Sequence, residues 1–191
     1  MLGSQLRNAL KHDSDSSSDD EKKCTQPQEH SHEEAKSHHG HADGLSRIDL
    51  KPLGAQITAS HSVKNGGGTG KELPANLLNP GEEGWNKWCE IDSKTARVFV
   101  KLNRRLKING FGFKSANDCP ERDPQEVTIT YLAPNYSNAK FATYKLEFDG
   151  KRWHTVNFSG FELESKQFMF DFKNDHIAQI QLGEIIFYKK D

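Results

Sequence analysis

The 191-residue sequence has few cysteines and no long apolar run. No apolar stretch approaches the roughly 18 residues of a membrane-spanning helix, and the first ten residues lack the apolar core of a signal peptide. The cysteines Cys24, Cys89 and Cys119 are an odd count without metal-site spacing, which predicts reduced thiols rather than a disulfide framework. These absences favour a soluble, cytoplasmic chain without a transmembrane segment.

A strong charge of one sign and a catalytic motif are also absent. Residues 47–191 carry 21 Lys and Arg against 18 Asp and Glu, a net charge of +3, so no broad field would attract a polyanion and no nucleic-acid partner is expected. His61, His154 and His176 are far apart in the sequence and lack an adjacent nucleophile motif. The sequence therefore predicts a protein that is not an enzyme and needs no cofactor.

Residues 1–46 contain no aromatic residue, and their five Lys and Arg stand against nine Asp and Glu. The run from Asp13 to Glu21 contains only serine and acidic residues. Such a segment cannot bury enough apolar surface to order itself. We therefore expect a disordered or extended, acidic and Ser/His-rich tail over residues 1–46, followed by one folded domain over residues 47–191.

Five histidines of this tail fall within twelve residues: His30, His32, His38, His39 and His41. Clustered imidazoles can capture Zn²⁺, Ni²⁺ or Cu²⁺ loosely. A structural metal site also needs fixed geometry and supporting hydrogen bonds, which a segment rich in Ser, Glu and Gly cannot supply. These histidines are therefore only a weak candidate, and no metal site is predicted.

The folded part has the alternation of β-strands almost throughout. Ala96, Val98, Val100 and Leu102 alternate with polar or aromatic residues, and no helical period lasts longer than two turns. The expected strand runs are 55–62, 96–102, 106–114, 126–132, 142–148, 152–158, 167–172 and 177–188. About eight short strands favour an antiparallel β-sandwich or jelly roll.

Three glycines mark expected features between or within these runs. Asp149-Gly150 predicts a hairpin turn. The apolar phase shifts at Gly110 and again at Gly183, so both positions are candidate β-bulges. These features give the order of the strands along the chain but not their partners.

The polar loop from Ser115 to Pro124 lies between two expected strands. It is rich in residues that build turns, and the planar guanidinium of Arg122 could form paired hydrogen bonds, here called a fork, to the neighbouring carboxylates. Calcium or a sugar could bind here, but a calcium site needs roughly six to eight oxygens from several segments. We therefore interpret four of its residues as a structural buttress: Asn117, Asp118, Arg122 and Asp123.

The order of several motifs resembles that of discoidin-like domains, also called coagulation-factor type C or galactose-binding-like domains. The motifs are Ile57-Thr-Ala-Ser-His-Ser, a Gly-rich loop, Ala75-Asn-Leu-Leu78, Trp85 and Trp88, Arg122-Asp-Pro124, Gly150-Lys-Arg-Trp153 and Gln181-Leu-Gly-Glu-Ile-Ile-Phe-Tyr188. The resemblance covers roughly residues 50 to 190. It implies an all-β, antiparallel, eight-stranded jelly-roll β-sandwich.

The resemblance also implies a non-catalytic binding module. Secreted members often join their first and last strands by a disulfide, and no cysteine lies near those positions here, which favours the intracellular branch. We therefore expect a protein-interaction subunit of a larger intracellular assembly, possible locations being a cilium or the cytoskeleton. The alternative is a lectin-like module that binds carbohydrate or phospholipid.

Loops at one end of the sandwich bind ligands in discoidin-like domains. The corresponding candidates for contact with a ligand or partner are Asn65, Lys71, Trp85 and Asn86. Trp88 and Trp153 are instead expected to pack inside the fold.

Overall fold

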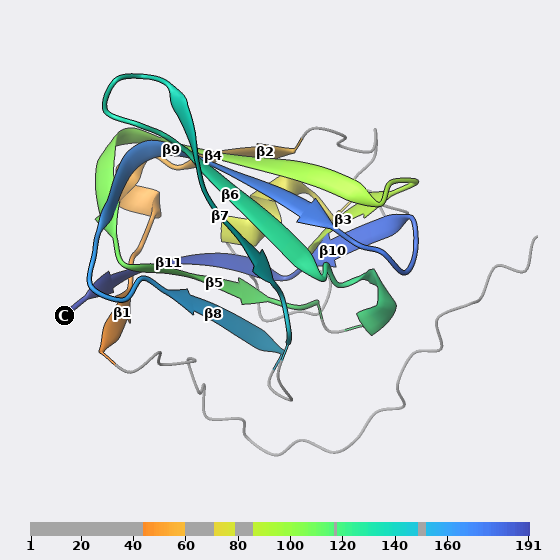
Figure 1. The fold of residues 1–191 in the computed structure, drawn as a ribbon. Coiled ribbons are helices and arrows are strands. Elements are labelled where there is room, and N and C mark those ends of the chain that lie inside the picture. The colour runs from red at the N-terminus through yellow and green to blue at the C-terminus, as the bar shows by residue number, and fades with distance from the viewer. Residues whose placement is uncertain (1–43, 60–70, 79–85, 117, 149–151) are drawn as a thin grey trace, which may run out of the picture.

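The computed structural model describes residues 44–59, 71–78, 86–116, 118–148 and 152–191, which form a β-sandwich (Figure 1). The strands are β1 (Leu45–Arg47), β2 (Gln56–Ala59), β3 (Trp88–Ile91), β4 (Thr95–Ile108), β5 (Gly110–Lys114), β6 (Glu126–Leu132), β7 (Asn138–Lys145), β8 (Trp153–Asn157), β9 (Leu163–Lys173), β10 (Gln179–Leu182) and β11 (Glu184–Lys190). In the described ranges, short 3₁₀ helices join them: η1 (Lys51–Leu53), η3 (Pro74–Leu78) and η4 (Pro120–Arg122). The described residues contain no helix long and apolar enough to span a membrane.

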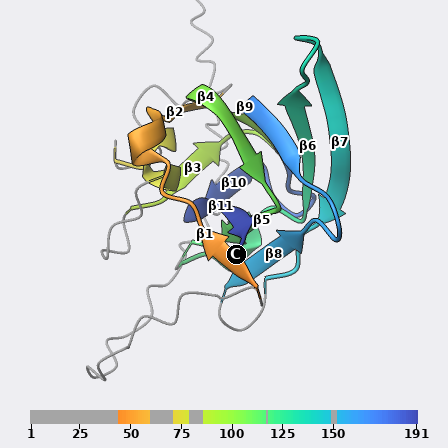
Figure 2. The ribbon, with the colours of Figure 1, turned by 90° about the vertical axis from the view of Figure 1, so that its left-hand side faces the viewer.

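Two antiparallel sheets face each other across the core, as the view in Figure 2 shows. One has five strands in the order β2-β4-β9-β6-β7, and the other has four in the order β1-β11-β5-β8. A further pair, β10-β3, adjoins the sandwich because β10 leads directly into β11.

The strand register defines two ends of the sandwich. Thr95, Lys173, Glu126 and Lys145 stand side by side across four strands and mark what we call the loop end. At the opposite end β1 begins, with Leu45 paired to Lys190 near the C-terminus, and we call this the terminus end. In Figure 1 the loop end lies to the right and the terminus end, with the C-terminus, to the left.

The core lies between the two sheets and is rich in phenylalanine. Phe111 of β5 is fully buried, and its ring centroid is 5.1 Å from those of both Phe170 and Phe187. Val98 and Val100 of β4 are also fully buried, whereas Arg97 and Lys101 of the same strand are exposed. The period-two pattern of the sequence therefore points its apolar side chains into the sandwich, where each buried Phe contributes roughly 3–5 kcal/mol to stability.

The expected all-β antiparallel sandwich is confirmed, but the two candidate bulges are wrong. Gly110 begins β5 in the four-stranded sheet, directly after β4 has ended in the five-stranded sheet. Gly183 likewise separates β10 from β11, which belong to different sheets. The phase shifts therefore mark changes of sheet, because each sheet has its own inward face. The register shifts actually lie at Lys101/Leu106 and at Ile129/Thr130.

The expected hairpin around Asp149-Gly150 is also wrong as a pairing, although these two residues lie outside the described part. The strands on either side are β7, which pairs with β6, and β8, which pairs with β5. The connection therefore crosses from one sheet to the other. The structure also adds two strands that the sequence pattern did not indicate, β1 and β3.

The expected burial of Trp88 is confirmed, since only 1% of it is exposed. Trp153 is half-buried and packs on the outer face of the four-stranded sheet, against a cluster of Leu45, Ile186 and Tyr188. Cys89 is a buried free thiol. Cys119 is disulfide-bonded, so the expectation of reduced thiols is wrong for this residue: a count of three leaves room for one bonded pair.

Candidate functional site at the loop end

Asn76 of η3 connects the chain before η3 to the chain just before β3 at the loop end. Its side-chain Nδ2 donates hydrogen bonds to the carbonyl oxygens of Lys71 and Lys87, each over 2.7 Å. Lys71 is exposed and Asn86 is half-buried, so these two predicted contact residues flank the same short helix. Asn65 and Trp85 lie outside the described residues.

Lys87 is the centre of a buried polar network. The lysine is 2% exposed, and its Nζ lies 2.6 Å from each carboxylate oxygen of Asp118. The same Nζ lies 3.3 Å from Oε1 of Glu72 and 3.2 Å from Oε1 of Gln181. A buried ammonium group is tolerated only when opposite charge and hydrogen-bond acceptors replace water, and all of these are present.

Two side-chain amides fasten η4 and its flanking residues to the β10 region. Nε2 of Gln181 donates to the carbonyl oxygens of Asp118 and Cys119, over 2.7 and 2.9 Å. Nδ2 of Asn174 donates to the carbonyl oxygen of Glu121 over 2.8 Å. Cys119 has a left-handed backbone with φ 33°, a conformation that persists when its surroundings hold it in place. The loop around η4 is therefore a rigid part of the loop end.

Asp123 is a buried acceptor in the same network. Burial raises the pKa of its carboxyl, although hydrogen bonds from Ser115 and Gln181 and the charge of Arg152 act in the opposite direction. The amide of Ser115 also donates to the carbonyl oxygen of Arg152 over 2.9 Å. Asp123 therefore holds chain segments together and offers little surface to a ligand.

The structure corrects one detail of the predicted buttress. The expected fork of Arg122 onto nearby carboxylates is not formed with Asp118, because Lys87 already contacts both oxygens of that carboxylate. The Nε atom of Arg122 is buried without a hydrogen-bond partner among the described residues. Asn117 lies outside the described part. The loop is thus tied to distant segments rather than mainly to itself.

Several polar groups of this network reach solvent. The Asp118 side chain is 34% exposed, Lys71 is exposed and Asn86 is half-buried. Leu73, between Lys71 and η3, is 45% exposed. A carboxylate accepts hydrogen bonds, an ammonium donates them and an amide does both. This combination suits a ligand with many hydroxyl groups, each of which is both donor and acceptor.

The described histidines form no metal site or catalytic pair. The backbone amide of His176 donates to Oδ1 of Asn174 over 2.8 Å, and Nδ1 of His154 lies 3.1 Å from the carbonyl oxygen of Glu147. No group of three or more His, Cys, Asp or Glu side chains with metal-binding proximity occurs in the described ranges. The weak metal candidates, His30, His32, His38, His39 and His41, lie outside those ranges.

A shallow groove of about 420 Å³ lies near this end on the outer face of the five-stranded sheet. It is lined by Thr95, Ala96, Arg97, Glu126, Thr128, Asp171, Phe172 and Lys173. Arg97 is paired with Asp171 through both carboxylate oxygens, so the central polar groups already satisfy one another. No aromatic ring of the outer face is among its lining residues, which makes it a poor platform for a sugar.

Sequence reasoning missed the residues that organise the loop end. Glu72, Lys87, Asn174 and Gln181 come from four segments, and each was unremarkable in its own stretch of sequence. The one available signal was the position of Lys87 beside Trp88, because a lysine next to a core tryptophan must find a partner if it is buried.

No family model and no curated protein sequence matches the chain. Among solved structures, the family 32 carbohydrate-binding module of Clostridium perfringens NanJ, in complex with galactose, is similar with a TM-score of 0.61 at 11% identity. The similarity covers 76% of this chain and 99% of that one.

Two further solved structures are similar to the chain to about the same degree. The module CpGH89CBM32-5 of Clostridium perfringens, in complex with GalNAc-β-1,3-galactose, gives a TM-score of 0.59 at 11% identity, covering 74% of this chain and 99% of the other. An F5/8 type C domain of a Bacteroides fragilis protein gives 0.60 at 14% identity, covering 78% and 98%. The described sandwich therefore has the discoidin-like, galactose-binding-like fold, as the sequence resemblance implied.

Proposed function

We propose that this chain is a non-catalytic carbohydrate-binding module and that its loop end binds a neutral saccharide of the galactose type. Two of the structures it resembles hold galactose or GalNAc-β-1,3-galactose, and each is covered over nearly its whole length. At this level of identity the likeness concerns the fold, so the assignment to a ligand is carried by the loop end itself.

The observation that carries the proposal is the buried network around Lys87. Glu72, Asp118 and Gln181 hold its ammonium group, and Asn76 fixes the carbonyls at the bases of two segments. A binding site needs contact groups whose supporting shell is rigid, because a loose shell loses affinity to disorder. The network supplies that shell because Asn76 bonds the carbonyl of Lys71, Asn86 precedes Lys87 in the chain, and Asp118 is itself a member of the network.

The expectation of a protein-interaction subunit in a ciliary or cytoskeletal assembly has no support in the fold or among its structural neighbours. The loop end offers only one exposed large apolar side chain among its described residues, Leu73. Protein interfaces usually bury an apolar or aromatic centre, whereas a saccharide is recognised by directed hydrogen bonds. The carbohydrate-binding alternative is therefore the function that we put forward.

The first experiment is a glycan array probed with the full chain, followed by calorimetry with galactose, N-acetylgalactosamine, glucose and mannose. We expect binding to the galactose-configured sugars and little binding to the other two. A chain that binds no saccharide on the array would overturn the proposal.

Variants then locate the site. Lys71→Ala removes an exposed polar group and Asn86→Ala a half-buried one, and each is expected to weaken saccharide binding about tenfold if its hydrogen bond is worth roughly 1.4 kcal/mol. Lys101→Ala is the matched control, since Lys101 is an exposed lysine of β4 away from the loop end. Equal affinities for all three variants would place the saccharide elsewhere.

A further inference from the structure

Two cationic side chains contact one exposed tyrosine at the terminus end, and a third follows from the neighbouring position in the chain. The guanidinium carbon of Arg105 lies 5.9 Å from the ring centroid of Tyr136, and Nζ of Lys166 lies 5.7 Å from it. Arg104, the residue before Arg105, is exposed. We call these four residues, Arg104, Arg105, Tyr136 and Lys166, the Tyr136 surface.

The two arginines are placed by the irregular part of β4. The register between β4 and β9 is interrupted between Lys101 and Leu106, so Arg104 and Arg105 stand outside the regular ladder. Nη2 of Arg105 donates to the carbonyl oxygen of Ala133 over 3.4 Å, which ties this bend to the β6–β7 loop. Interruptions of this kind redirect side chains and recur beside binding sites.

The β6–β7 loop holds Tyr136 in a strained conformation. Tyr136 has φ +62°, in the left-handed region that is unfavourable for a residue other than glycine, and it is 72% exposed. Its amide donates to Ala133 over 3.0 Å, and Oδ1 of Asn135 accepts from the amide and hydroxyl of Ser137. A rigid loop that keeps an aromatic ring strained and exposed is an observation from which a binding role can be inferred.

The cations of the Tyr136 surface are not neutralised from within the described part of the chain. The ion pairs found there include neither Arg104 nor Arg105 nor Lys166. Lys107, farther along β4, is by contrast paired with Glu162 over 3.4 Å. Positive charge that no described carboxylate pairs with therefore lies beside Tyr136, and an anionic ligand could pair with it.

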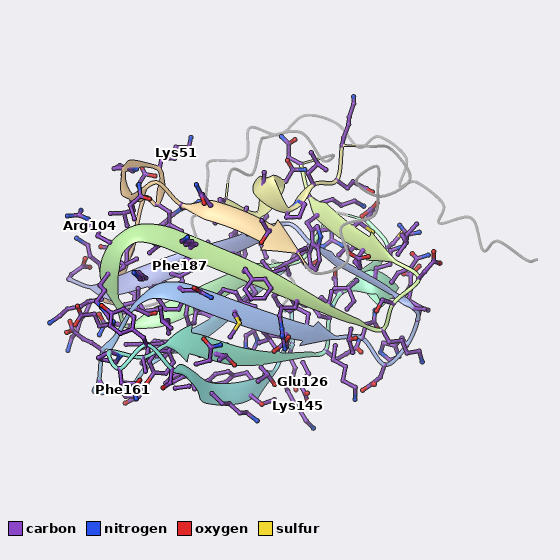
Figure 3. All side chains as sticks on the ribbon, turned by 90° about the horizontal axis from the view of Figure 1, so that it is seen from above. Lys51, Arg104, Glu126, Lys145, Phe161 and Phe187 are labelled. Atoms are coloured by element: carbon purple, nitrogen blue, oxygen red, sulfur yellow. The ribbon has the colours of Figure 1, made fainter. Side chains whose placement is uncertain are left out.

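A flat aromatic platform lies at the same end. Phe161 is 48% exposed, and its ring stacks on buried Phe158 with centroids 5.3 Å apart and an interplanar angle of 6°. Phe141 also contacts it, at 5.6 Å. Because Phe158 covers one face of this ring, the exposed area belongs to the other face and the edge. Figure 3 shows Phe161 and Arg104 at the terminus end, away from Glu126 and Lys145.

We propose that the terminus end binds an acidic polysaccharide. Its carboxylate or sulfate groups pair with Arg104, Arg105 and Lys166, and one of its sugar rings stacks on Phe161. Tyr136 positions the cations by contacting Arg105 and Lys166 through its ring. This site is separate from the loop end and does not depend on neutral saccharide binding there.

The geometry favours a polysaccharide over an anionic membrane. Both exposed rings contact neighbouring side chains: Tyr136 is flanked by two cations, and Phe161 is stacked on Phe158. Insertion into lipid would require apolar tips that project beyond the charged groups. A planar guanidinium matches the two oxygens of a carboxylate or sulfate group, and a ring with one face open suits a sugar ring.

The test measures binding of the full chain to immobilised polygalacturonate and chondroitin sulfate, with uncharged galactan as the reference. We expect binding to the acidic polymers to exceed binding to galactan. The double variant Arg104→Ala, Arg105→Ala should weaken that binding at least about tenfold. Lys145→Ala, which removes one exposed lysine far from this end, should leave it unchanged.

Two further variants separate a saccharide site from a mere cluster of charge. Phe161→Ala should weaken binding to both acidic polysaccharides but leave binding to inorganic polyphosphate unchanged. Tyr136→Gly relieves the left-handed strain and removes the ring, so it should weaken polysaccharide binding without loss of stability. The proposal is overturned if the wild-type chain does not bind the acidic polymers, if the arginine variant binds like Lys145→Ala, or if Phe161→Ala has no effect. It is equally overturned if phosphatidylserine vesicles bind and the polysaccharides do not.

Discussion

At the scale of single residues, the loop end depends on one buried cation. Lys87 contacts Asp118, Glu72 and Gln181, and none of these contacts can be replaced by water at a residue that is 2% exposed. Lys87→Met keeps the volume of the side chain but leaves the two carboxylates facing an apolar group. We expect the free energy of unfolding to fall by about 3 kcal/mol, the range found when one partner of a buried ion pair is removed.

Urea unfolding of Lys87→Met beside Lys94→Ala measures this effect. Lys94 is an exposed lysine whose Nζ donates to the carbonyl oxygen of Asp175 over 3.2 Å, so its loss should change stability little. If the two variants were equally stable, the network around Lys87 would not be what holds the loop end together.

Cys89 provides a residue-scale prediction that depends on pH. Burial, with a smaller effect of Glu72, raises the pKa of its thiol from 9.0 to about 11. The folded state thus favours the neutral thiol, and the resulting stability is fully present below pH 9.0 and is lost as the pH rises through about 11.

The difference in unfolding free energy between the wild type and Cys89→Ala isolates this contribution. It should shrink with a slope of at most about 1.4 kcal/mol per pH unit across that window. The pKa values of Tyr144 and Tyr188 are also raised by burial, but these residues titrate in both proteins. Parallel stability curves for the two proteins between pH 9 and 11 would contradict the assignment.

At the scale of elements, Asn109 joins three parts of the terminus end where β4 gives way to β5. Its Oδ1 accepts the amide of Lys190 over 2.8 Å, and its Nδ2 donates to the carbonyl oxygen of Phe161 over 3.2 Å. Its backbone also bonds to Tyr188 and Phe158. A single side chain therefore connects the change of sheet to the last strand and to the β8–β9 loop.

Asn109→Ala removes both side-chain hydrogen bonds while leaving the backbone bonds in place. We expect a loss of about 2 kcal/mol, because two partly buried hydrogen bonds are lost. Hydrogen exchange should report faster exchange of the Lys190 amide. Asn157→Ala, at an exposed asparagine of β8, is the control and should change neither quantity. If the Lys190 amide exchanged equally slowly in Asn109→Ala, the end of β11 would be held without the Asn109 side chain.

The sequence predicted most strands because one face of each is buried. Ala96, Val98 and Val100 alternate with polar residues, so period two was visible without any knowledge of partners. The pattern could not reveal which sheet a strand joins. The shift at Gly110 had the same appearance as a bulge, since the inward face changes whether a residue is inserted or the chain changes sheet. β3 escaped detection because all but one of its four residues are buried.

The candidate site was predictable only in outline. The loop around Asp118 was recognised as turn-rich and structural, but its partners Lys87 and Gln181 lie 31 and 63 residues away. Sequence spacing carries no information about such contacts unless the strand pairing is known. The Tyr136 surface was missed for the same reason, since Arg105 and Lys166 belong to different strands and meet only through the β4–β9 pairing.

At the scale of the whole molecule, the near-zero net charge conceals an uneven distribution. The loop end contains a lysine neutralised by two carboxylates, whereas the terminus end has an exposed Arg104 and half-buried Arg105 and Lys166 outside any described ion pair. We propose that these two surfaces, at opposite ends of one sandwich, recognise different chemical groups. One chain could therefore attach to a neutral saccharide and an acidic polymer at once, and joined contacts would raise overall affinity.

Salt dependence distinguishes the two surfaces in one protein. Charge pairing at the Tyr136 surface is screened as the Debye length falls from about 10 Å at 0.1 M salt to about 3 Å at 1 M. Binding of chondroitin sulfate should therefore weaken steeply over this range. Binding of galactose at the loop end involves an uncharged ligand and should stay within about twofold. Calorimetry of the full chain with each ligand at both salt concentrations measures the contrast. Equal salt dependence for the two ligands would mean that both bind through the same kind of contact, and the assignment of separate surfaces would fail.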